Sequence, residues 1–159
     1  MQEPLTKDAQ RIQTQLAALG YPNTVIQLPQ STRTAQEAAE AIGCEVSQIA
    51  KSIVFRLTRR NLPLLVVASG THRVNEQRLA QECHEGVEKG DANFVREHTG
   101  FVIGGVPPFG HAESIRTIID VDLLPFRSIW AAAGHPQAVF ELTPDQLIRM
   151  THGDVMSVT

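Results

Sequence analysis

The sequence predicts an α+β fold: a mixed, mainly antiparallel, curled sheet of about six to seven strands with flanking helices. Short β-rich runs joined by tight turns dominate the centre of the chain, while helical patterns collect at its start, middle and end. Hydrophobic residues make up 42% of the chain, which is enough for a packed core. Because domains usually contain about 100–200 residues, we expect the 159 residues to form one domain, 1–159.

Helices are predicted where apolar residues recur every three to four positions between a capping residue and a glycine. Thr34 with Glu37, and Thr143 with Gln146, have the spacing of capping boxes, in which each side chain satisfies a free backbone N–H of the first turn. The predicted helices span 5–19, 35–42, 75–83, 92–98 and 144–151.

Strands are predicted in runs rich in β-branched residues that are bounded by turn signals. Arg59-Arg60-Asn61 is interpreted as the turn of a central hairpin, and Gly86 and Gly90 are interpreted as bracketing another turn. The candidate strands span 24–28, 52–58, 63–69, 101–103, 114–121, 127–133, 138–142 and 154–158.

The charge balance excludes a strongly basic protein that wraps a nucleic-acid duplex. The formal net charge is -3, whereas such proteins need many phosphate contacts. We therefore expect no DNA partner, although a small contact with one end of a nucleic acid remains compatible with this charge. The apolar stretches are too short to span a bilayer, and the opening MQEPLTKDAQ has no apolar signal-peptide core. A cytoplasmic protein without a membrane partner is expected.

The sequence predicts neither a metal site nor an organic cofactor. The six histidines show no HxxxH or HExxH spacing, and P-loop and dinucleotide-binding glycine motifs are missing. The two cysteines, Cys44 and Cys83, form no CxxC pair and are expected to be free in a reducing compartment. There is no GxSxG nucleophile motif. A thiol-dependent hydrolase that uses Cys83 or Cys44 stays open as an alternative.

Lys51 is the first candidate functional residue. The chain has three lysines, and two of them, Lys7 and Lys89, sit in polar surroundings. Lys51 instead lies among apolar residues at the mouth of a strand, so its ammonium group must pair, reach out to solvent or act on a ligand. A lysine that only reaches solvent from a strand end and a lysine that binds a phosphate or a substrate oxygen both fit this pattern.

A glycine–proline loop follows the candidate strand 101–103. Gly104 and Gly105 allow the backbone to approach a ligand closely and to point N–H groups at it, and Pro107 and Pro108 stiffen the loop. Rigid backbone donors suit an ester carbonyl on whose oxygen negative charge develops. The alternative interpretation is a rigid turn between two strands.

His135 follows Gly134 at the end of another candidate strand. Its imidazole could orient a substrate or a water molecule, or assist proton transfer. The local sequence alone favours a solvent-exposed loop histidine. His111 and Glu113, just after the glycine–proline loop, are weaker candidates of the same kind.

Over about 34–158 the chain resembles the YbaK/prolyl-tRNA synthetase-associated domain family. The resemblance rests on the segments AEAIGCEVSQIAKSIVFR, VVASGTHRVN, GFVIGGVPPFGH and IWAAAGHPQAVFELTPDQL, taken in this order. Members of this family are aminoacyl-tRNA editing domains, free-standing or inserted in prolyl-tRNA synthetase. They hydrolyse the ester that joins a wrong amino acid to its tRNA, commonly tRNA-Pro.

The resemblance also implies roles for individual residues. Lys51 matches the family's lysine in the aminoacyl-adenosine pocket, and Gly104 and Pro108 match the ends of its GxxxP loop. Gly134 and His135 fall in a third motif, where many members have a second glycine or a threonine. We therefore expect a catalytic set of Lys51, Gly104 and His135, and a substrate-binding set of Ser52, Gly105, Pro108 and Gly134. The resemblance implies no enzyme nucleophile, so a positioned water, a ribose hydroxyl or a substrate thiol attacks the ester.

The predicted function is therefore hydrolysis in trans of mischarged aminoacyl-tRNA. The expected substrate is tRNA-Pro carrying a small wrong amino acid such as cysteine, alanine, serine or threonine. Hydrophobic pockets separate amino acids one methylene apart by only about 1–3 kcal/mol, which is why such editing is needed. The expected partners are the acceptor end of the tRNA and prolyl-tRNA synthetase. The alternative is a non-catalytic regulatory module that binds tRNA or a synthetase.

Overall fold

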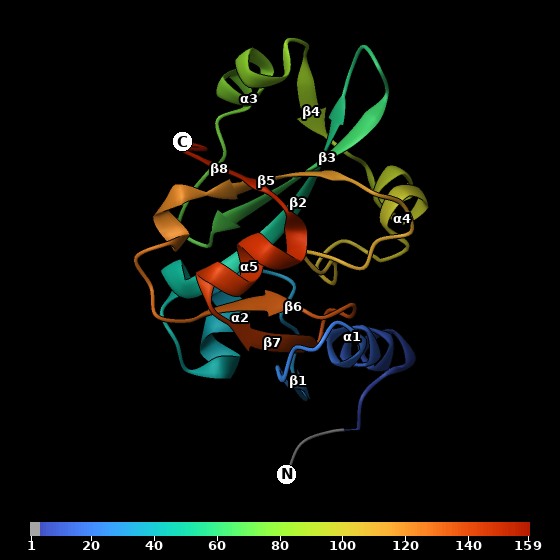
Figure 1. Ribbon diagram of the computed structural model, residues 1–159, viewed down its shortest axis with the longest axis vertical. Coiled ribbons are helices and arrows are strands. Elements are labelled where there is room, and N and C mark those ends of the chain that lie inside the picture. The colour runs from blue at the N-terminus through green and yellow to red at the C-terminus, as the bar shows by residue number, and fades with distance from the viewer. Residues whose placement is uncertain (1–3) are drawn as a thin grey trace.

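The computed structural model describes residues 4–159, which form five α-helices, two 3₁₀ helices and eight strands (Figure 1). The helices are α1 (Lys7–Ala18), α2 (Ala35–Ile42), η1 (Val46–Gln48), α3 (Glu76–Cys83), α4 (Ala92–Thr99), η2 (Val121–Leu123) and α5 (Pro144–Thr151). The strands are β1 (Val25–Gln27), β2 (Ile49–Leu57), β3 (Leu62–Ser69), β4 (Val87–Lys89), β5 (Arg116–Asp120), β6 (Ile129–Ala132), β7 (Ala138–Leu142) and β8 (Asp154–Met156).

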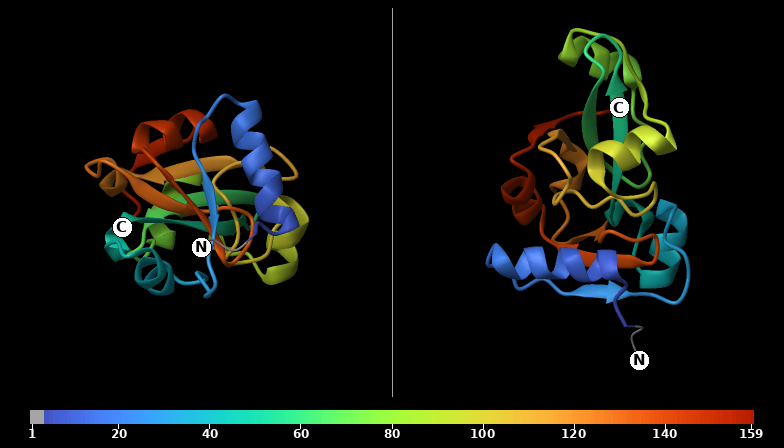
Figure 2. Two further views of the ribbon diagram at one scale, coloured as in Figure 1. Left: turned by 90° about the horizontal axis from the view of Figure 1, so that it is seen from below. Right: turned by 90° about the vertical axis from the view of Figure 1, so that its right-hand side faces the viewer.

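All eight strands belong to one mixed sheet, which confirms the predicted α+β class. Its strand order is β1-β7-β6-β2-β3-β5-β8, and β4 pairs with β2 beside this path. The β1–β7, β6–β7, β2–β3 and β2–β4 pairs are antiparallel, whereas the β2–β6, β3–β5 and β5–β8 pairs are parallel. Figure 2 shows α1 and β1 at one end of the molecule, and the β2–β3 hairpin with α3 at the other.

The two faces of β2 and β3 contribute to separate hydrophobic clusters, because successive side chains of a strand point to opposite faces. Val54 and Val67 belong to the larger cluster, which also includes buried residues of α1, α4 and α5. Phe55 and Val66 belong to a second cluster with buried residues of α3. None of the helices in residues 4–159 is both long and apolar enough to cross a membrane.

Of the two predicted capping boxes, the one at α5 is complete and the one at α2 has only the arm from Thr34. In α5 both arms of the predicted box are present, because the side chains of Thr143 and Gln146 each accept a bond from the other residue's backbone N–H. In α2 the Thr34 hydroxyl accepts from the Glu37 N–H at 3.1 Å, and it also contacts the Glu37 carboxylate. Gly43 then ends α2 in the left-handed conformation.

Two local predictions were wrong, and the sheet has eight strands rather than six or seven. The segment 101–103 forms no strand: Phe101 is buried and lies under the Arg11 guanidinium, so this segment is an anchored loop. The segment between Gly86 and Gly90, predicted as a turn, contains β4. Its side chains are too polar to show a strand pattern, and pairing with β2 is supported by an ion pair between Arg56 and Glu88.

Candidate active site

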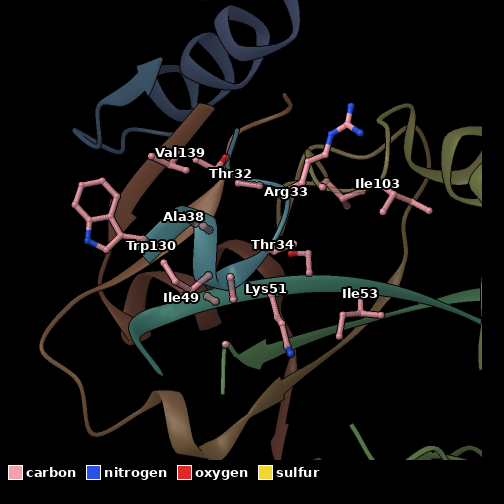
Figure 3. Close-up of a pocket in the computed structure, with 18 of the residues that line it drawn as sticks. Thr32, Arg33, Thr34, Ala38, Ile49, Lys51, Ile53, Ile103, Trp130 and Val139 are labelled. Carbon is pink, nitrogen blue, oxygen red and sulfur yellow. The ribbon is translucent and has the colours of Figure 1, made fainter. Parts of the chain in front are cut away.

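A cavity opens where β2 changes its strand partner. One edge of β2 pairs with β3 along 50–57. On the other edge, pairing with β6 covers only Ile49 and Ala50, and pairing with β4 begins at Phe55. Within residues 4–159, no strand therefore pairs with 51–53 on this side. A cavity of about 540 Å³ lies at this gap, and Figure 3 shows the side chains around it. This volume is within the range of roughly 300–1,000 Å³ that is common for small-ligand sites.

The side chains that line the cavity are mainly apolar, and three of them are basic. Its main apolar side chains are Ala38, Ile49, Ile53, Val106, Trp130 and Val139. Its basic side chains are Arg33, Lys51 and Lys89, and no aspartate or glutamate among the described residues lines it. None of the ion pairs in residues 4–159 involves these three cations. In a chain with a net charge of -3, the lining of this cavity is a local concentration of positive charge, which favours an anionic ligand.

Lys51 lies in the unpaired stretch of β2 and is half-buried. Figure 3 shows its side chain leaving β2 on the side away from Arg33. Burial lowers the pKa of the Lys51 ammonium, and the nearby charge of Lys89 lowers that pKa further. The Asp120 carboxylate opposes both effects and raises the pKa. Within residues 4–159, Lys51 is thus an ammonium group that lines a cavity and has no ion-pair partner.

Ser52 offers polar groups to the same gap. Its side-chain Oγ is buried and has no hydrogen-bond partner among the residues that the structure describes. On this edge the Val54 carbonyl accepts from the Gly90 N–H at 2.9 Å. Because alternate residues of a strand direct their backbone groups to the same edge, the N–H and C=O of Ser52 also face the gap. An unsatisfied buried hydroxyl costs about 1–3 kcal/mol, so a ligand that bonds to it is favoured.

The glycine–proline loop forms another wall of the cavity through Gly104. Gly104 has φ = +90°, and a Cβ atom there would lie 2.8 Å from Cγ of Arg33. A side chain at this position would therefore meet both backbone strain and a steric contact. Gly105 is buried behind the cavity, and its N–H already donates to the Val102 carbonyl at 2.9 Å. This N–H is engaged within the loop, so the expectation that it points at a ligand is not met.

The other predicted site residues stand behind the cavity and do not line it. Pro108 and Gly134 are buried, and Gly134 has φ = +94°. The His135 side chain is half-buried, and its Nδ1 accepts a hydrogen bond from the Gln137 N–H at 3.1 Å. An Nδ1 that accepts a bond leaves the imidazole proton on Nε2. His135 therefore stabilises its own turn in this structure, and the predicted set divides into Lys51, Ser52 and Gly104 at the cavity and four residues that support it.

His111 and Glu113 have structural partners as well. His111 Nε2 donates to the Pro107 carbonyl over 2.7 Å, which braces the loop that carries Gly104. Burial lowers the pKa of His111, and the neutral form can still supply this donor. Glu113 forms an ion pair with His98. Neither side chain lines the cavity.

Sequence reasoning missed three residues that line the cavity. Arg33 precedes α2, Lys89 lies on the unpredicted strand β4, and Trp130 lies on β6. The polar sequence neighbours of Lys89 give no sign of a functional site, and only the pairing of β4 with β2 shows that Lys89 lies at the cavity. A rim residue of this kind gives no local sequence signal, because it reaches the site through strand pairing.

The cysteines do not support thiol chemistry. Burial raises the pKa of both the Cys44 and the Cys83 thiols, which keeps them in the less nucleophilic protonated form. Neither residue lines the cavity. The alternative of a thiol-dependent hydrolase therefore lacks the activated nucleophile that it needs.

One group of metal-type ligands lies outside the cavity. His72, Asp120 and Asp122 bring ligand atoms within 4.8 Å of one another. The two carboxylate oxygens of buried Asp120 already accept backbone N–H bonds, one from Ser69 and one from Asp122, both at 3.0 Å. Asp120 also contacts His72 Nδ1 at 2.7 Å. These contacts fix the end of β3 next to β5.

Comparison with known proteins identifies the family. A model described as "Aminoacyl-tRNA editing domain" matches residues 29–150. A Bacillus subtilis relative, "Uncharacterized protein YwhH", is 33% identical over 144 residues, which cover 91% of each chain. An Enterococcus faecalis relative, "Putative Cys-tRNA(Pro)/Cys-tRNA(Cys) deacylase EbsC", is 24% identical over 79% of this chain and 77% of its own.

A solved structure gives the same result. It is described as "Crystal structure of a putative trans-editing enzyme for prolyl tRNA synthetase", and it is 39% identical with a TM-score of 0.92. The alignment covers 98% of this chain and 99% of that chain. The chain therefore belongs to the aminoacyl-tRNA editing domain family, and its activity is that of an aminoacyl-tRNA deacylase.

Proposed function

We propose that this protein hydrolyses, in trans, tRNA-Pro that carries a small wrong amino acid such as cysteine, alanine, serine or threonine. The observation that carries the proposal is a cavity that combines Lys51, the unpartnered hydroxyl of Ser52 and an apolar wall without acidic residues. The names of two similar proteins support the choice of tRNA. One name mentions Cys-tRNA(Pro), and the other describes a trans-editing enzyme for prolyl tRNA synthetase. The whole chain, 1–159, acts in the cytoplasm as one editing unit.

Hydrolysis requires stabilisation of the charge that develops on the ester carbonyl oxygen. In the proposed mechanism the attacking oxygen, from water or from a ribose hydroxyl of the substrate, adds to the carbonyl carbon. The Lys51 ammonium stabilises the resulting oxyanion, and the Ser52 hydroxyl, on the opposite face of β2, binds another polar group of the substrate. The bond from the carbonyl carbon to the ribose oxygen then breaks, and that oxygen takes up a proton. When a ribose hydroxyl attacks first, water completes the release of the amino acid.

The apolar wall supports the proposed preference for small amino acids. Trp130 of β6, Val139 of β7 and Ala38 of α2 are apolar side chains in this wall. A wrong amino acid with a small side chain fits a bounded apolar space, whereas a larger side chain meets steric contact. This is the second selection step of editing, because the cavity admits only residues small enough to enter it.

Prolyl-tRNA synthetase is the proposed protein partner. Among the described residues, the lining of the cavity contains three basic side chains and no acidic ones. Three cations suit the acceptor end of a tRNA and are too few to recognise a whole tRNA. Prolyl-tRNA synthetase, which releases the mischarged tRNA, is the expected source of substrate and of tRNA selection. Adding the synthetase should lower the KM for mischarged tRNA-Pro and leave the KM for a mischarged tRNA of another specificity unchanged.

The test is a panel of tRNA-Pro samples, each charged with proline or with one small amino acid, followed by measurement of amino acid release. Wild-type protein should release the small wrong amino acids and spare proline. Lys51→Ala should lower the rate by about 10²-fold or more, as expected for the loss of one oxyanion-stabilising group. Lys7→Ala, at the start of α1 and outside the cavity, is the matched control and should retain the full rate.

Two results would contradict the proposal. An unchanged rate for a folded Lys51→Ala protein would remove Lys51 from the mechanism. Tight binding of tRNA-Pro without release of any amino acid would instead identify a non-catalytic binding module. Circular dichroism of each variant confirms that a lost rate is not a lost fold.

A further inference from the structure

We propose that Lys89, which lines the same cavity as Lys51, binds the phosphate of the substrate's 3′-terminal nucleotide and so positions the ester at Lys51. This inference rests on the proposed function and adds a residue and a ligand group to it. Lys89 acts through the substrate's phosphate, so its role is positioning.

The register of the sheet puts the two lysines on one face. Lys89 pairs directly with Phe55 across the β2–β4 ladder, and opposite residues of such a pair point to the same face. Along β2 the side chains of Phe55, Ile53 and Lys51 share that face, because strand side chains alternate with a period of two. Both lysines line the cavity, at opposite ends of the stretch of β2 that lacks a partner on this edge.

Lys89 is held in place by its neighbours in the chain. Gly90 donates its N–H to the Val54 carbonyl at 2.9 Å, which fixes the end of β4 against β2. The residue before Lys89 is Glu88, whose carboxylate forms an ion pair with Arg56. Glu88 and Lys89 are adjacent residues of a strand, so their side chains point to opposite faces. Lys89 therefore lines the cavity, and Glu88, the acidic residue next to it in the chain, is ion-paired with Arg56.

The charges around the two lysines favour an anion. Burial lowers the pKa of the Lys51 ammonium, and the charge of Lys89, which lines the same cavity, lowers that pKa further. Asp120 is the acid that acts on Lys51, and its oxygens are engaged by Ser69, Asp122 and His72. No carboxylate among the described residues lines the cavity to neutralise the pair. A bound anion would offset the repulsion between the two ammonium groups.

The chemistry of the substrate identifies the anion as a phosphate. An amino acid in ester linkage has lost its carboxylate charge, and its free amine is a cation that two lysines would repel. The nearest negative group to the ester is the phosphate on the 5′ side of the terminal nucleoside. Ammonium groups bind phosphate as compact point charges. Binding that phosphate with Lys89 leaves Lys51 near the ester carbonyl of the same nucleotide.

The test compares two small substrates that differ by a single phosphate: 3′-O-alanyl-adenosine and the same ester with a 5′-phosphate. For wild-type protein the phosphate should raise kcat/KM by about three- to tenfold, mainly through a lower KM. Lys89→Gln should reduce this ratio to near one, and Lys89→Arg should restore most of it. Lys7→Gln removes the same charge outside the cavity and should keep the wild-type ratio.

The outcomes separate this inference from the proposed function. If wild-type protein hydrolyses both esters and Lys89→Gln keeps the wild-type ratio, the phosphate site is wrong while the deacylase activity stands. If neither ester nor any aminoacyl-tRNA is hydrolysed, both proposals fall. Calorimetric binding of the non-hydrolysable 3′-alanylamide analogue, with and without the 5′-phosphate, gives a second readout. Equal affinities of wild-type protein for the two analogues would overturn the phosphate site without reference to turnover.

Discussion

The Gly134 N–H donates to the carbonyl oxygen of Gly105 at 2.9 Å. This bond ties the glycine–proline loop to the turn between β6 and β7, two segments that are about thirty residues apart in the chain. A Cβ atom on Gly105 would lie 2.9–3.0 Å from the His135 backbone. The two motifs are therefore one packed unit, in which the turn at 134–135 supports the loop, and Gly104 and Val106 of the loop line the cavity.

Gly105→Ala should uncouple the loop from the turn. The added methyl group meets backbone atoms that cannot rotate away, so we expect a loss of about 1–3 kcal/mol in the free energy of unfolding and a large loss of deacylation. Chemical denaturation and single-turnover hydrolysis check the two effects. Gly20→Ala is the control: a Cβ there meets nothing within 4 Å, so its cost is backbone strain at φ = +85° far from the cavity. If Gly105→Ala keeps full activity, the loop does not need this close packing.

Ser52→Ala should separate stability from activity. The Ser52 hydroxyl is buried without a partner, so its removal should leave the free energy of unfolding unchanged or raise it by up to about 1 kcal/mol. Deacylation should nevertheless fall, because the substrate loses a hydrogen-bond partner. Ser69→Ala is the matched control, since the Ser69 hydroxyl donates to the Ser47 carbonyl at 2.8 Å and its loss should destabilise the protein. A strongly destabilised Ser52→Ala protein would show that Ser52 has a structural partner after all.

His111→Gln should flatten the pH dependence of stability below neutrality. Burial lowers the pKa of His111 below its ordinary value of about 6.5, so the unfolded chain takes up a proton at a higher pH than the folded one. The stabilising contribution is therefore complete above about pH 6.5 and is lost as the pH falls toward the folded-state pKa. A glutamine can still donate to Pro107 and does not titrate. Urea denaturation between about pH 5 and 7.5 should show a smaller decline for the variant; parallel curves would count against this role.

Lys51 should lose its proton at a lower pH than an ordinary lysine. Burial and the charge of Lys89 both lower its pKa, so the fraction of reactive free amine at mildly alkaline pH should exceed that expected of an ordinary lysine. Labelling with an amine-reactive reagent over a pH series, read out by mass spectrometry of each lysine peptide, measures this directly. Lys89→Gln should move the Lys51 titration to higher pH, and Lys7→Gln should leave it in place. An identical Lys51 curve in wild-type and Lys89→Gln proteins would mean that the two charges do not interact.

The sequence predicted the elements whose signals are local. Capping residues and glycines located α2 and α5, and β-branched runs located β2 and β3, because propensity and periodicity act within a few residues. The strand β4 was not predicted, because its residues Val87, Glu88 and Lys89 show little strand propensity or alternation. Its existence depends on pairing with β2, a contact between segments more than thirty residues apart.

The site was predictable only in part for the same reason. Lys51 stood out because a lysine among apolar residues is locally unusual, and Gly104 stood out through the composition of its loop. Arg33, Lys89 and Trp130 have ordinary neighbours in the sequence and reach the cavity only through the fold. The sequence could name Gly105 and His135 but not distinguish a residue that faces the ligand from one that holds the wall behind it.

The position of the cavity within a single sheet has a kinetic consequence. Its floor is a strand anchored by hydrogen bonds at both ends, so the binding surface exists before the substrate arrives and needs no hinge motion to assemble. Such a preformed recess spends little binding energy on ordering the protein. Release of the free amino acid should then be fast, and the chemical step should set the turnover rate.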